Sequence, residues 1–392
     1  MLYGRARTLF RQLHLYAGLF FGSLFMLSGL SGSSIVWLPE LDSMLNPDLF
    51  QAVPASGASV EGAASITANT VQEVIEALTA DPAYGRPLQI TLPEYANEAL
   101  IAWYRVKPSG NASLLALRTD RQVMVNPYTL QVNGERNWGE IGVSRRVLMP
   151  TLFHFHRYLI AGELGKILVG ISGLVLFVTS VIGLVLWWPK PNRSALRRAF
   201  TISHAGSWRR FNYSFHKVAG FFAAPILIVI GFSGWYLNLP KWVTPIVSSI
   251  ATVSAPGKQN NQTPIHGTQI PPEQALTIAQ GLYSNARISR ISLPSTASTP
   301  YRITLRQPDE VRQDDGATRV TIDAYSGKVL RLQDPMNAPG GDTFLNWLYP
   351  LHSRAVFGNA GRWFLTFFGV VPLLFLISGW GIWLRRRKIH RP

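Results

Sequence analysis

The sequence predicts an α+β membrane protein in which four transmembrane helices form two tandem repeats of helix, outer domain and helix. Three observations predict this fold: four apolar stretches without Asp, Glu, Lys or Arg, two long polar segments between them, and an internal repeat. The net charge of +16 alone would favour a nucleic-acid binder. However, only 15% of the 392 residues are charged and 47% are hydrophobic, so we expect a lipid bilayer as partner and no nucleic acid.

The charge-free stretches are 12–39, 167–189, 218–240 and 363–384, and each is long enough to cross a bilayer. The first has too long an apolar run for a signal peptide and no small-residue cleavage site, so we expect it to remain as an anchor. The short segments beside these stretches are basic: they carry Arg5, Arg7 and Arg11, then Lys190, Arg193, Arg197, Arg198, Arg209 and Arg210, then Arg385, Arg386, Arg387 and Lys388. Positive charge marks the cytoplasmic side, so both termini should be cytoplasmic and the long segments periplasmic in a bacterial inner membrane.

These patterns divide the chain into eight predicted parts. They are helix one (8–39), outer domain one (40–148), an outer interfacial segment with helix two (150–189), a basic cytoplasmic loop (190–212), helix three (213–240), outer domain two (241–349), an interfacial segment with helix four (350–385) and a cytoplasmic tail (386–392). The segments 52–64 and 254–267, which are rich in Ala, Ser, Gly, Gln and Asn, are predicted linkers.

The repeat is visible in two motifs. Helices one and three share H-x3-G-x10-G-x-S-G, beginning at His14 and His216. Helices two and four share H-x5-G-x2-G-[KR], beginning at His156 and His352, with further glycines at equal offsets. Close packing of membrane helices accounts for glycines by themselves. The histidines need another explanation, because an ionisable side chain in a membrane segment is costly and usually functional.

The topology places the four histidines in two pairs at equal depth, an inner pair (His14 and His216) and an outer pair (His156 and His352). Two facing imidazoles suit the axial positions of haem iron, and the glycines would leave room for a porphyrin. An interfacial role is the alternative for any single histidine. Zinc fits less well, because the helix interiors offer no third or fourth ligand. The chain has no cysteine, which excludes disulfides, thiolate metal sites and c-type haem.

The other histidines carry weaker signals. His154 lies two residues before His156 but aligns with Pro350 in the repeat, so it is a fallback ligand only. His204, His266 and His390 have no repeat partner and are expected to face solvent.

The sequence also predicts where the two sites lie. Each outer histidine precedes its apolar stretch by about ten residues, or about 15 Å of helix. The inner and outer sites should be separated by about 35 Å, the length of the 23 residues from His14 to Trp37. The basic residues Arg157, Lys166, Arg354 and Arg362 could meet haem propionates, and Arg145, Arg146, Arg157 and Arg354 could dock a substrate. Anchoring at the membrane surface is the alternative for all of them.

Each outer segment reads as a helix followed by strands. In the first copy these are a helix over 67–80 and strands over 88–92, 100–106 and 122–125; in the second copy they are a helix over 271–281 and strands over 288–293, 301–306 and 319–322. A small α+β fold with an antiparallel sheet is therefore expected for each outer domain.

Together these motifs resemble the PepSY-associated transmembrane helix family over nearly the whole chain. The resemblance rests on the L-H-x3-G opening, the S-G near the helix end, the F-H-R-Y-L and P-L-H-S-R segments, the basic tail after Trp383, and the turns 126–130 and 323–327. Both turns depart from the usual D-P-x-T-G of that family. Within the family the chain is most similar to inner-membrane ferric-siderophore reductases of the ferrioxamine type. That resemblance implies a protein with two haem b groups, ligated by His14, His216, His156 and His352, and two periplasmic PepSY domains.

The expected function is electron transfer across the membrane from the inner to the outer haem, and on to Fe(III) held by a periplasmic siderophore. No dinucleotide-binding motif is present, so a quinol or a separate reductase should be the donor. Two other functions fit the same sequence: a quinol-linked cytochrome subunit of another oxidoreductase, and a haem-free anchor that presents PepSY domains to an envelope partner.

Overall fold

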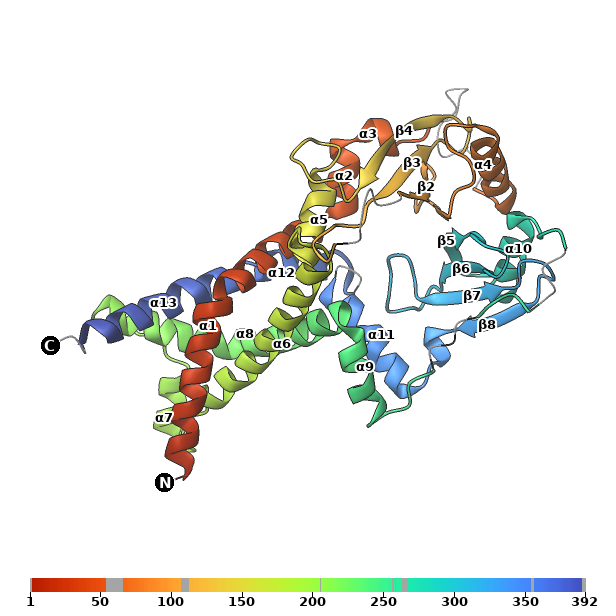
Figure 1. Ribbon diagram of the computed structural model, residues 1–392. Coiled ribbons are helices and arrows are strands. Elements are labelled where there is room, and N and C mark those ends of the chain that lie inside the picture. Colours follow the sequence, from red (N-terminus) through yellow and green to blue (C-terminus); the bar gives the residue numbers. More distant parts are fainter. Residues whose placement is uncertain are drawn as a thin grey trace. The chain divides into compact units, whose positions relative to one another are not determined.

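The computed structural model of the chain (Figure 1) describes residues 2–53, 66–106, 113–204, 206–255, 257, 259–262, 267–353 and 356–389. Arg354, His266, His390, most of the first predicted linker and part of the second lie outside these residues. The chain forms two units, which are described separately. The helix unit consists of Met1–Trp37, Leu152–Ile246 and Leu351–Pro392, and the sheet unit consists of Leu38–Thr151 and Val247–Pro350.

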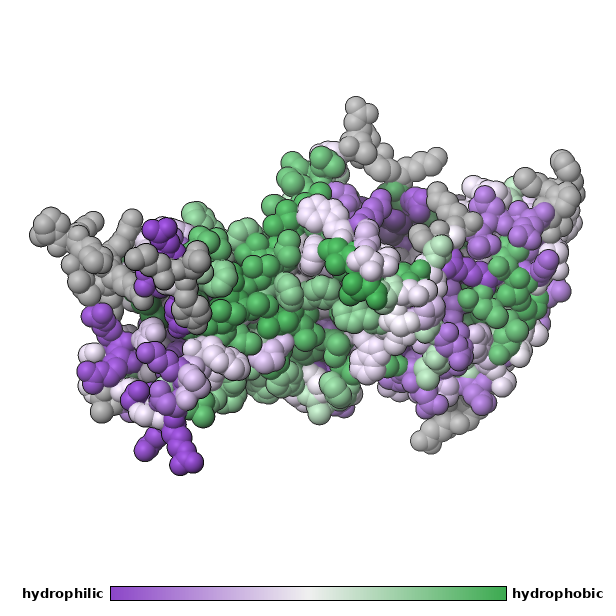
Figure 2. Space-filling view, turned by 90° about the horizontal axis from the view of Figure 1, so that it is seen from below, coloured by the Kyte–Doolittle hydropathy of each residue, from purple (hydrophilic) through white to green (hydrophobic). Residues whose placement is uncertain are grey.

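The helix unit contains the four predicted membrane helices. They are α1 (Leu2–Ile35), α6 (Gly162–Trp187), α8 (Trp208–Asn238) and the consecutive pair α12 (Gly358–Phe368) and α13 (Val371–Ile389). Each is long and apolar enough to span a bilayer, so the chain is a multi-pass membrane protein. Figure 2 shows hydrophobic side chains over the middle of this unit and hydrophilic ones at the end where α7 (Arg193–Ala199) and the start of α1 lie.

Small residues bring two of these helices into close contact. Helix α6 packs mainly against α8, and α1 packs against α13 and α6. A Cβ on Gly173 would lie 2.6 Å from the backbone nitrogen of Trp235, and one on Gly231 would lie 2.6 Å from that of Phe177. These two glycines are therefore needed for the α6–α8 contact, as the alternative interpretation of the glycines predicted.

The fourth membrane helix is interrupted, which the sequence prediction did not include. The break lies at Gly369 and Val370, between α12 and α13. Pro372 follows this break. In a continuous helix the ring of Pro372 would clash with the carbonyl of the residue four positions earlier. A Cβ on Gly369 would also overlap Ser33 of α1, so the break lies where α1 approaches most closely.

Shorter helices connect the parts of the chain. They are α5 (Leu148–Tyr158), α7 (Arg193–Ala199), α9 (Pro240–Ser248) and α11 (Gly340–His352). The chain turns sharply after α5, where Leu159 and Ile160 have φ angles of 47° and 56°. Gly162 and Gly358, which begin α6 and α12, have φ angles of 52° and 54°, a region that favours glycine. The repeated glycine of H-x5-G is therefore required by backbone conformation.

The sheet unit is built from helices α2, α3, α4 and α10 and eight strands. The helices are α2 (Leu38–Leu45), α3 (Pro47–Phe50), α4 (Ala68–Ala80) and α10 (Pro272–Leu282), with a short 3-10 helix at Pro335–Asn337. The strands are β1 (Gln89–Thr91), β2 (Leu100–Arg105), β3 (Asp120–Val125), β4 (Val132–Trp138), β5 (Arg287–Ser292), β6 (Tyr301–Arg306), β7 (Thr318–Ile322) and β8 (Val329–Gln333). Both predicted helices and all six predicted strands are present, with ends shifted by at most two residues.

The eight strands form one antiparallel sheet in the order β4-β3-β2-β1-β5-β6-β7-β8. Strands β1 and β5 join the two copies, and Ile90 pairs with Ile291 across the junction. Helices α4 and α10 bury apolar residues, among them Val74 and Leu276, in one core that both copies share. The two predicted outer domains are thus the two halves of one unit, because each half leaves an edge strand that the other half pairs.

Two strands, β4 and β8, were not predicted. Strand β4 reads Val-Asn-Gly-Glu-Arg-Asn-Trp, which has no apolar alternation, and β8 is a partly exposed edge strand. Strand β4 is polar and β8 is short. Pairing with β3 and β7 determines their strand conformation more than their own sequence does.

Candidate functional site

The inner pair of histidines lies within the helix unit. His14 of α1 and His216 of α8 face each other with ring centroids 6.3 Å apart and ring planes at 87°. The ring of His14 lies against Gly183 of α6, where a Cβ would come within 3.1 Å of its Cε1 atom, and that of His216 lies 3.8 Å from a Cβ on Gly379. Both glycines belong to the repeat, so they leave space for the imidazole rings.

The outer pair is also formed. His156 near the end of α5 and His352 at the end of α11 have ring centroids 6.2 Å apart, with ring planes at 52°. Their rings lie against Gly32 of α1 and Gly234 of α8, where a Cβ would come within 3.1 and 3.3 Å of the Cε1 atoms. The Ser-Gly pairs of the first motif therefore contact the histidines of the second motif.

The outer pair lies closer to the membrane helices than predicted. We expected about 15 Å of continuous helix between each histidine and its apolar stretch. Instead, α5 ends at Tyr158 and α11 ends at His352, and a turn precedes the next helix in both copies. This prediction was wrong because helical spacing was assumed across the positive-φ residues Leu159, Ile160 and Phe357.

All four rings are held through Nδ1. In the outer pair, Nδ1 of His156 lies 3.0 Å from the Ser28 carbonyl and 3.2 Å from Ser31 Oγ, and Nδ1 of His352 lies 2.8 Å from Ser233 Oγ. The repeat places Ser31 and Ser233 at equivalent positions.

In the inner pair, Nδ1 of His14 lies 3.1 Å from both the carbonyl and the hydroxyl of Thr179, and Nδ1 of His216 lies 2.7 Å from Ser378 Oγ. As in the outer pair, these hydrogen bonds leave Nε2 as the nitrogen available to a metal. A hydrogen bond of this kind at the other ring nitrogen is typical of metal-ligating histidines.

The rings of each pair are close enough for one metal ion to bind both. Metal–imidazole bonds are about 2 Å long, so an ion between the two rings would be within reach of a nitrogen of each. The two pairs lie at 6.3 and 6.2 Å. Within the described residues no group of three or more His, Asp or Glu could hold a metal ion, which argues against a tetrahedral zinc site. The donor set therefore fits haem with two imidazole ligands.

Two further glycines leave open space beside the inner pair. Gly18 and Gly220 lie one turn after His14 and His216, and a Cβ at either position would meet nothing within 4 Å. By contrast, a Cβ on Gly22 would meet Leu376 and one on Gly29 would meet the Gly369 backbone. The glycines of the membrane helices thus have three kinds of surroundings: another helix, a histidine ring, or open space. The open space beside Gly18 and Gly220 is consistent with the space that a flat ligand would need.

The two pairs lie at different depths along the same helices. His14 and Ser31, which contacts His156, are 17 residues apart on α1, and His216 and Ser233 are equally separated on α8. At 1.5 Å per residue this spacing is about 25 Å. It is shorter than the predicted 35 Å because the outer histidines reach back to the level of the serines.

Burial keeps the outer histidines neutral. Both precede the segments that span the membrane, and desolvation lowers the pKa of His156 to about 4 and that of His352 to about 3. A neutral imidazole is the form that binds a metal.

Neither His154 nor His204, the other two histidines that the structure describes, joins a pair. His154 is buried, and its ring stacks on Tyr158 with centroids 5.6 Å apart, whereas the ring of His156 faces His352. His204 is exposed and lies beside Phe211.

Three buried polar atoms at the ends of α5 and α8 have no hydrogen-bond partner among the described residues. They are Nε of Arg157, Nε1 of Trp235 and Oδ1 of Asn238. Trp235 follows Gly234, which contacts His352, and Arg157 reaches the Leu237 carbonyl at 3.4 Å. Buried polar groups without partners are costly, so these atoms fit a site that receives a polar ligand.

The other basic candidates are engaged elsewhere. Lys166 pairs with Glu163, and the guanidinium of Arg362 lies 4.0 Å from the centre of the Trp37 ring. In the sheet unit, Arg145 and Arg146 both pair with Asp48 of α3. Both were predicted as docking residues; they share one carboxylate, so one of their two positive charges is balanced within this cluster.

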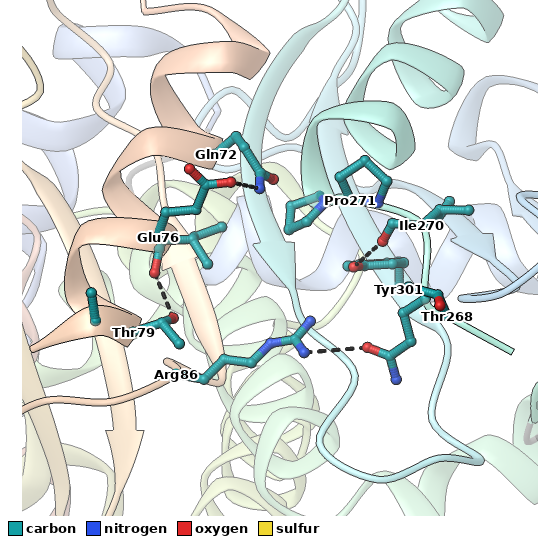
Figure 3. Close-up of a pocket in the computed structure, with 12 residues that line it drawn as sticks. Gln72, Glu76, Thr79, Arg86, Thr268, Ile270, Pro271 and Tyr301 are labelled. Atoms are coloured by element: carbon teal, nitrogen blue, oxygen red, sulfur yellow. Dashed lines mark hydrogen bonds between the residues drawn. The ribbon is translucent and has the colours of Figure 1, made fainter. Parts of the chain in front are cut away.

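A pocket of about 610 Å³ lies in the sheet unit between α4 and α10 (Figure 3). Its polar groups largely satisfy one another: Gln72 donates to Glu76, Arg86 donates to Gln269, and the Tyr301 hydroxyl donates to the Ile270 carbonyl at 2.8 Å. It is therefore a weaker candidate than the histidine pairs.

Sequence reasoning missed two contact residues. Thr179 and Ser378 hold the inner histidines but do not align in the repeat, so no motif marked them. Ser31 and Ser233 were marked by the H-x3-G-x10-G-x-S-G motif, and only their role was missed.

No curated protein matches this chain. Its sequence does match the profile of the PepSY-associated TM region over residues 11–386, which includes all four membrane helices, both histidine pairs and the whole sheet unit. The chain therefore belongs to the PepSY-associated transmembrane family.

Proposed function

We propose that this protein is a bacterial inner-membrane electron-transfer protein with two haem b groups, and that it reduces a periplasmic ferric siderophore and releases Fe(II). The observation that carries this proposal is the presence of two facing imidazole pairs, at 6.3 and 6.2 Å, about 25 Å apart along the same helices. Bound haem would supply one-electron redox chemistry at each pair.

The residues of the chain have separate tasks in this proposal. His14 and His216 would hold the inner haem, and His156 and His352 the outer haem, through Nε2 in each case. Arg157, whose buried Nε atom has no partner among the described residues, is a candidate partner for carboxylates at the outer site.

The proposed topology places both termini and the basic loop with α7 in the cytoplasm and the sheet unit in the periplasm. The hydrophilic end of the helix unit in Figure 2 is consistent with this orientation. The substrate, Fe(III) in a siderophore, would be released on reduction because hard oxygen donors hold Fe(II) weakly. A quinol or a separate reductase would supply the electrons.

Absorption spectra test the cofactor. The detergent-purified protein should bind about two haem b per chain, with oxidised and dithionite-reduced spectra of six-coordinate haem. His14→Ala and His352→Ala should each lose about half of the haem, while His204→Ala, which removes an exposed histidine outside both pairs, should retain it. A colourless wild-type protein from cells with adequate haem would overturn the redox function and favour the haem-free anchor.

Reduction of the substrate requires a second measurement. The reduced protein should be reoxidised by a ferric siderophore under anaerobic conditions, with one Fe(II) formed per electron. If it binds haem but does not react with ferric chelates, the cytochrome-subunit function becomes the better explanation.

A further inference from the structure

One of the four histidines is held differently from the others. His14 and His156 have Nδ1 within 3.1 Å of a main-chain carbonyl, from Thr179 and Ser28, and His352 interacts with the Ile230 carbonyl as well as with Ser233 Oγ at 2.8 Å. His216 instead uses the Ser378 hydroxyl at 2.7 Å. A carbonyl belongs to the backbone and a hydroxyl to one side chain, so a single substitution can remove the whole contact only at His216.

The positions of the protons follow from these contacts. A carbonyl oxygen only accepts, so Nδ1 of His14 and of His156 must carry the proton. The single proton of Ser233 is directed to the Val229 carbonyl at 2.6 Å, so Ser233 Oγ accepts from Nδ1 of His352. Three of the four rings therefore have a free lone pair on Nε2, the arrangement that iron ligation requires.

His216 has the least redundant support. Ser378 provides its hydrogen bond, and the Ser378 hydroxyl lies 3.3 Å from the Phe375 carbonyl, to which it can donate while it accepts from Nδ1. For comparison, the Ile230 carbonyl also interacts with His352, so that ring has a second acceptor nearby. The tautomer of His216 thus depends on one buried hydroxyl.

Ser378 is itself fixed by the helix that carries His216. Asn212 lies one turn before His216 on α8, is buried, and donates from Nδ2 to the Ser378 carbonyl at 2.9 Å. A Cβ on Gly381 would lie 3.0 Å from that Nδ2 atom, so the glycine leaves room for the amide. Asn212, Ser378 and His216 form a closed set of contacts between α8 and α13.

We propose that Ser378, held by Asn212, is the positioning residue that orients His216 and places its proton on Nδ1, so that the inner site depends on this hydroxyl. The Thr179 hydroxyl is dispensable, because the Thr179 carbonyl holds His14 without it. This inference rests on the proposed function as far as haem is concerned, but the orientation and tautomer of His216 do not depend on haem.

The test compares two hydroxyl deletions at the same site. Ser378→Ala removes the contact to His216, Thr179→Val removes the redundant contact to His14, and Ser378→Thr restores a hydroxyl. In full-length protein from haem-limited cells, nitrogen NMR of labelled histidine should show His216 protonated at Nδ1 in the wild type, in Thr179→Val and in Ser378→Thr. Ser378→Ala should lose this single tautomer.

With haem supplied, Ser378→Ala should retain inner-site haem about 10-fold less tightly, since loss of the hydrogen-bond partner of a metal-ligating histidine typically has this effect. The midpoint potential of the inner site should become more positive, because the ligand loses a hydrogen bond that makes it more basic. The outer site should keep its spectrum, which also shows that the variant is folded.

Three results separate this inference from the proposed function. An unchanged tautomer and an unchanged inner-site potential in Ser378→Ala would overturn the inference and leave the function intact. Equal effects of Thr179→Val and Ser378→Ala would also overturn it. A tautomer change in Ser378→Ala in a protein that never binds haem would support the positioning role and overturn the proposed function.

Discussion

Asp42 and Arg136 form a buried, two-pronged ion pair in the sheet unit. The Nη1 and Nη2 atoms of Arg136 lie 2.8 and 2.6 Å from the two carboxylate oxygens of Asp42, and both side chains are less than 5% exposed. The Nε atom of Arg136 donates to Gln122 of β3 at 2.7 Å, so this group ties α2 to the outer strands of the sheet.

Asp42→Ala should therefore destabilise the protein strongly. It leaves the Arg136 charge buried without its partner, which typically costs about 3–5 kcal/mol. Thermal unfolding of the full chain in detergent measures the effect. Glu163→Ala is the control, because its pair with Lys166 is largely exposed and contributes about 1 kcal/mol or less. Equal unfolding midpoints for the two variants would contradict the prediction.

The pair of arginines around Asp48 predicts a pH effect. The hydrogen bond from Arg145 lowers the pKa of Asp48 below its ordinary value, with a smaller contribution from Arg146. A carboxyl with a lowered pKa in the folded state stabilises the fold above its unfolded pKa of about 4, and the stabilisation is lost as pH falls below that value.

Asp48→Asn should therefore lower the stability slightly at pH 7, by about 1 kcal/mol or less because the group is partly exposed. The unfolding midpoints of wild type and variant should converge near pH 3. A difference that grows as the pH is lowered would show that another group is responsible.

The glycines of α8 predict opposite responses to the same substitution. Gly231→Ala would place its Cβ 2.6 Å from the Phe177 backbone and should cost about 1–3 kcal/mol through overpacking. Gly220→Ala meets open space and should leave stability unchanged or slightly raised, since Ala favours helix by about 1 kcal/mol. Thermal unfolding midpoints of the two variants test this. Equal midpoints for Gly231→Ala and Gly220→Ala would contradict the prediction.

A larger residue at the open glycines should affect the ligand instead. Gly220→Leu fills the space one turn after His216, so the haem bound per chain should fall by about half while the sheet unit stays folded. The pyridine haemochrome assay gives the haem content, and protease resistance of the sheet unit provides the control. Full haem content in Gly220→Leu would show that the space beside Gly220 serves another purpose.

Much of this architecture could be predicted from the sequence because it depends on periodicity. The apolar stretches, the helix over 67–80 and strands such as 301–306 carry their own pattern, and the repeat identified the four histidines before any contact was known. The pairing in space of His14 with His216 and of His156 with His352 agrees with that interpretation.

Other features depend on contacts between distant segments, which no local pattern encodes. Thr179 and Ser378 reach the inner histidines from α6 and α13 at positions that the repeat does not relate. The break before Pro372 had a local signal, but the turns after α5 and α11 rest on positive φ angles at Leu159, Ile160 and Phe357, side chains that rarely adopt them. The predicted depth of the outer pair was wrong for this reason.

The junction between the two copies makes a further prediction. Ile90 and Ile291 are fully buried partners on β1 and β5, so Ile90→Ala should cost about 2–5 kcal/mol. Because the core is shared, hydrogen exchange should accelerate in β6 and β7 as well as in β2 and β3. Exchange that changes only in the first copy would show that the halves fold independently.

The β1–β5 junction also limits how this architecture can be divided or expressed in parts. Each copy alone would end in a strand of three or six residues with an unpaired row of amides and carbonyls, the feature that promotes aggregation between chains. A half-length chain would need a second copy of itself, or another strand, to cover that edge. Because both halves lie in one chain, each covers the edge of the other at any protein concentration.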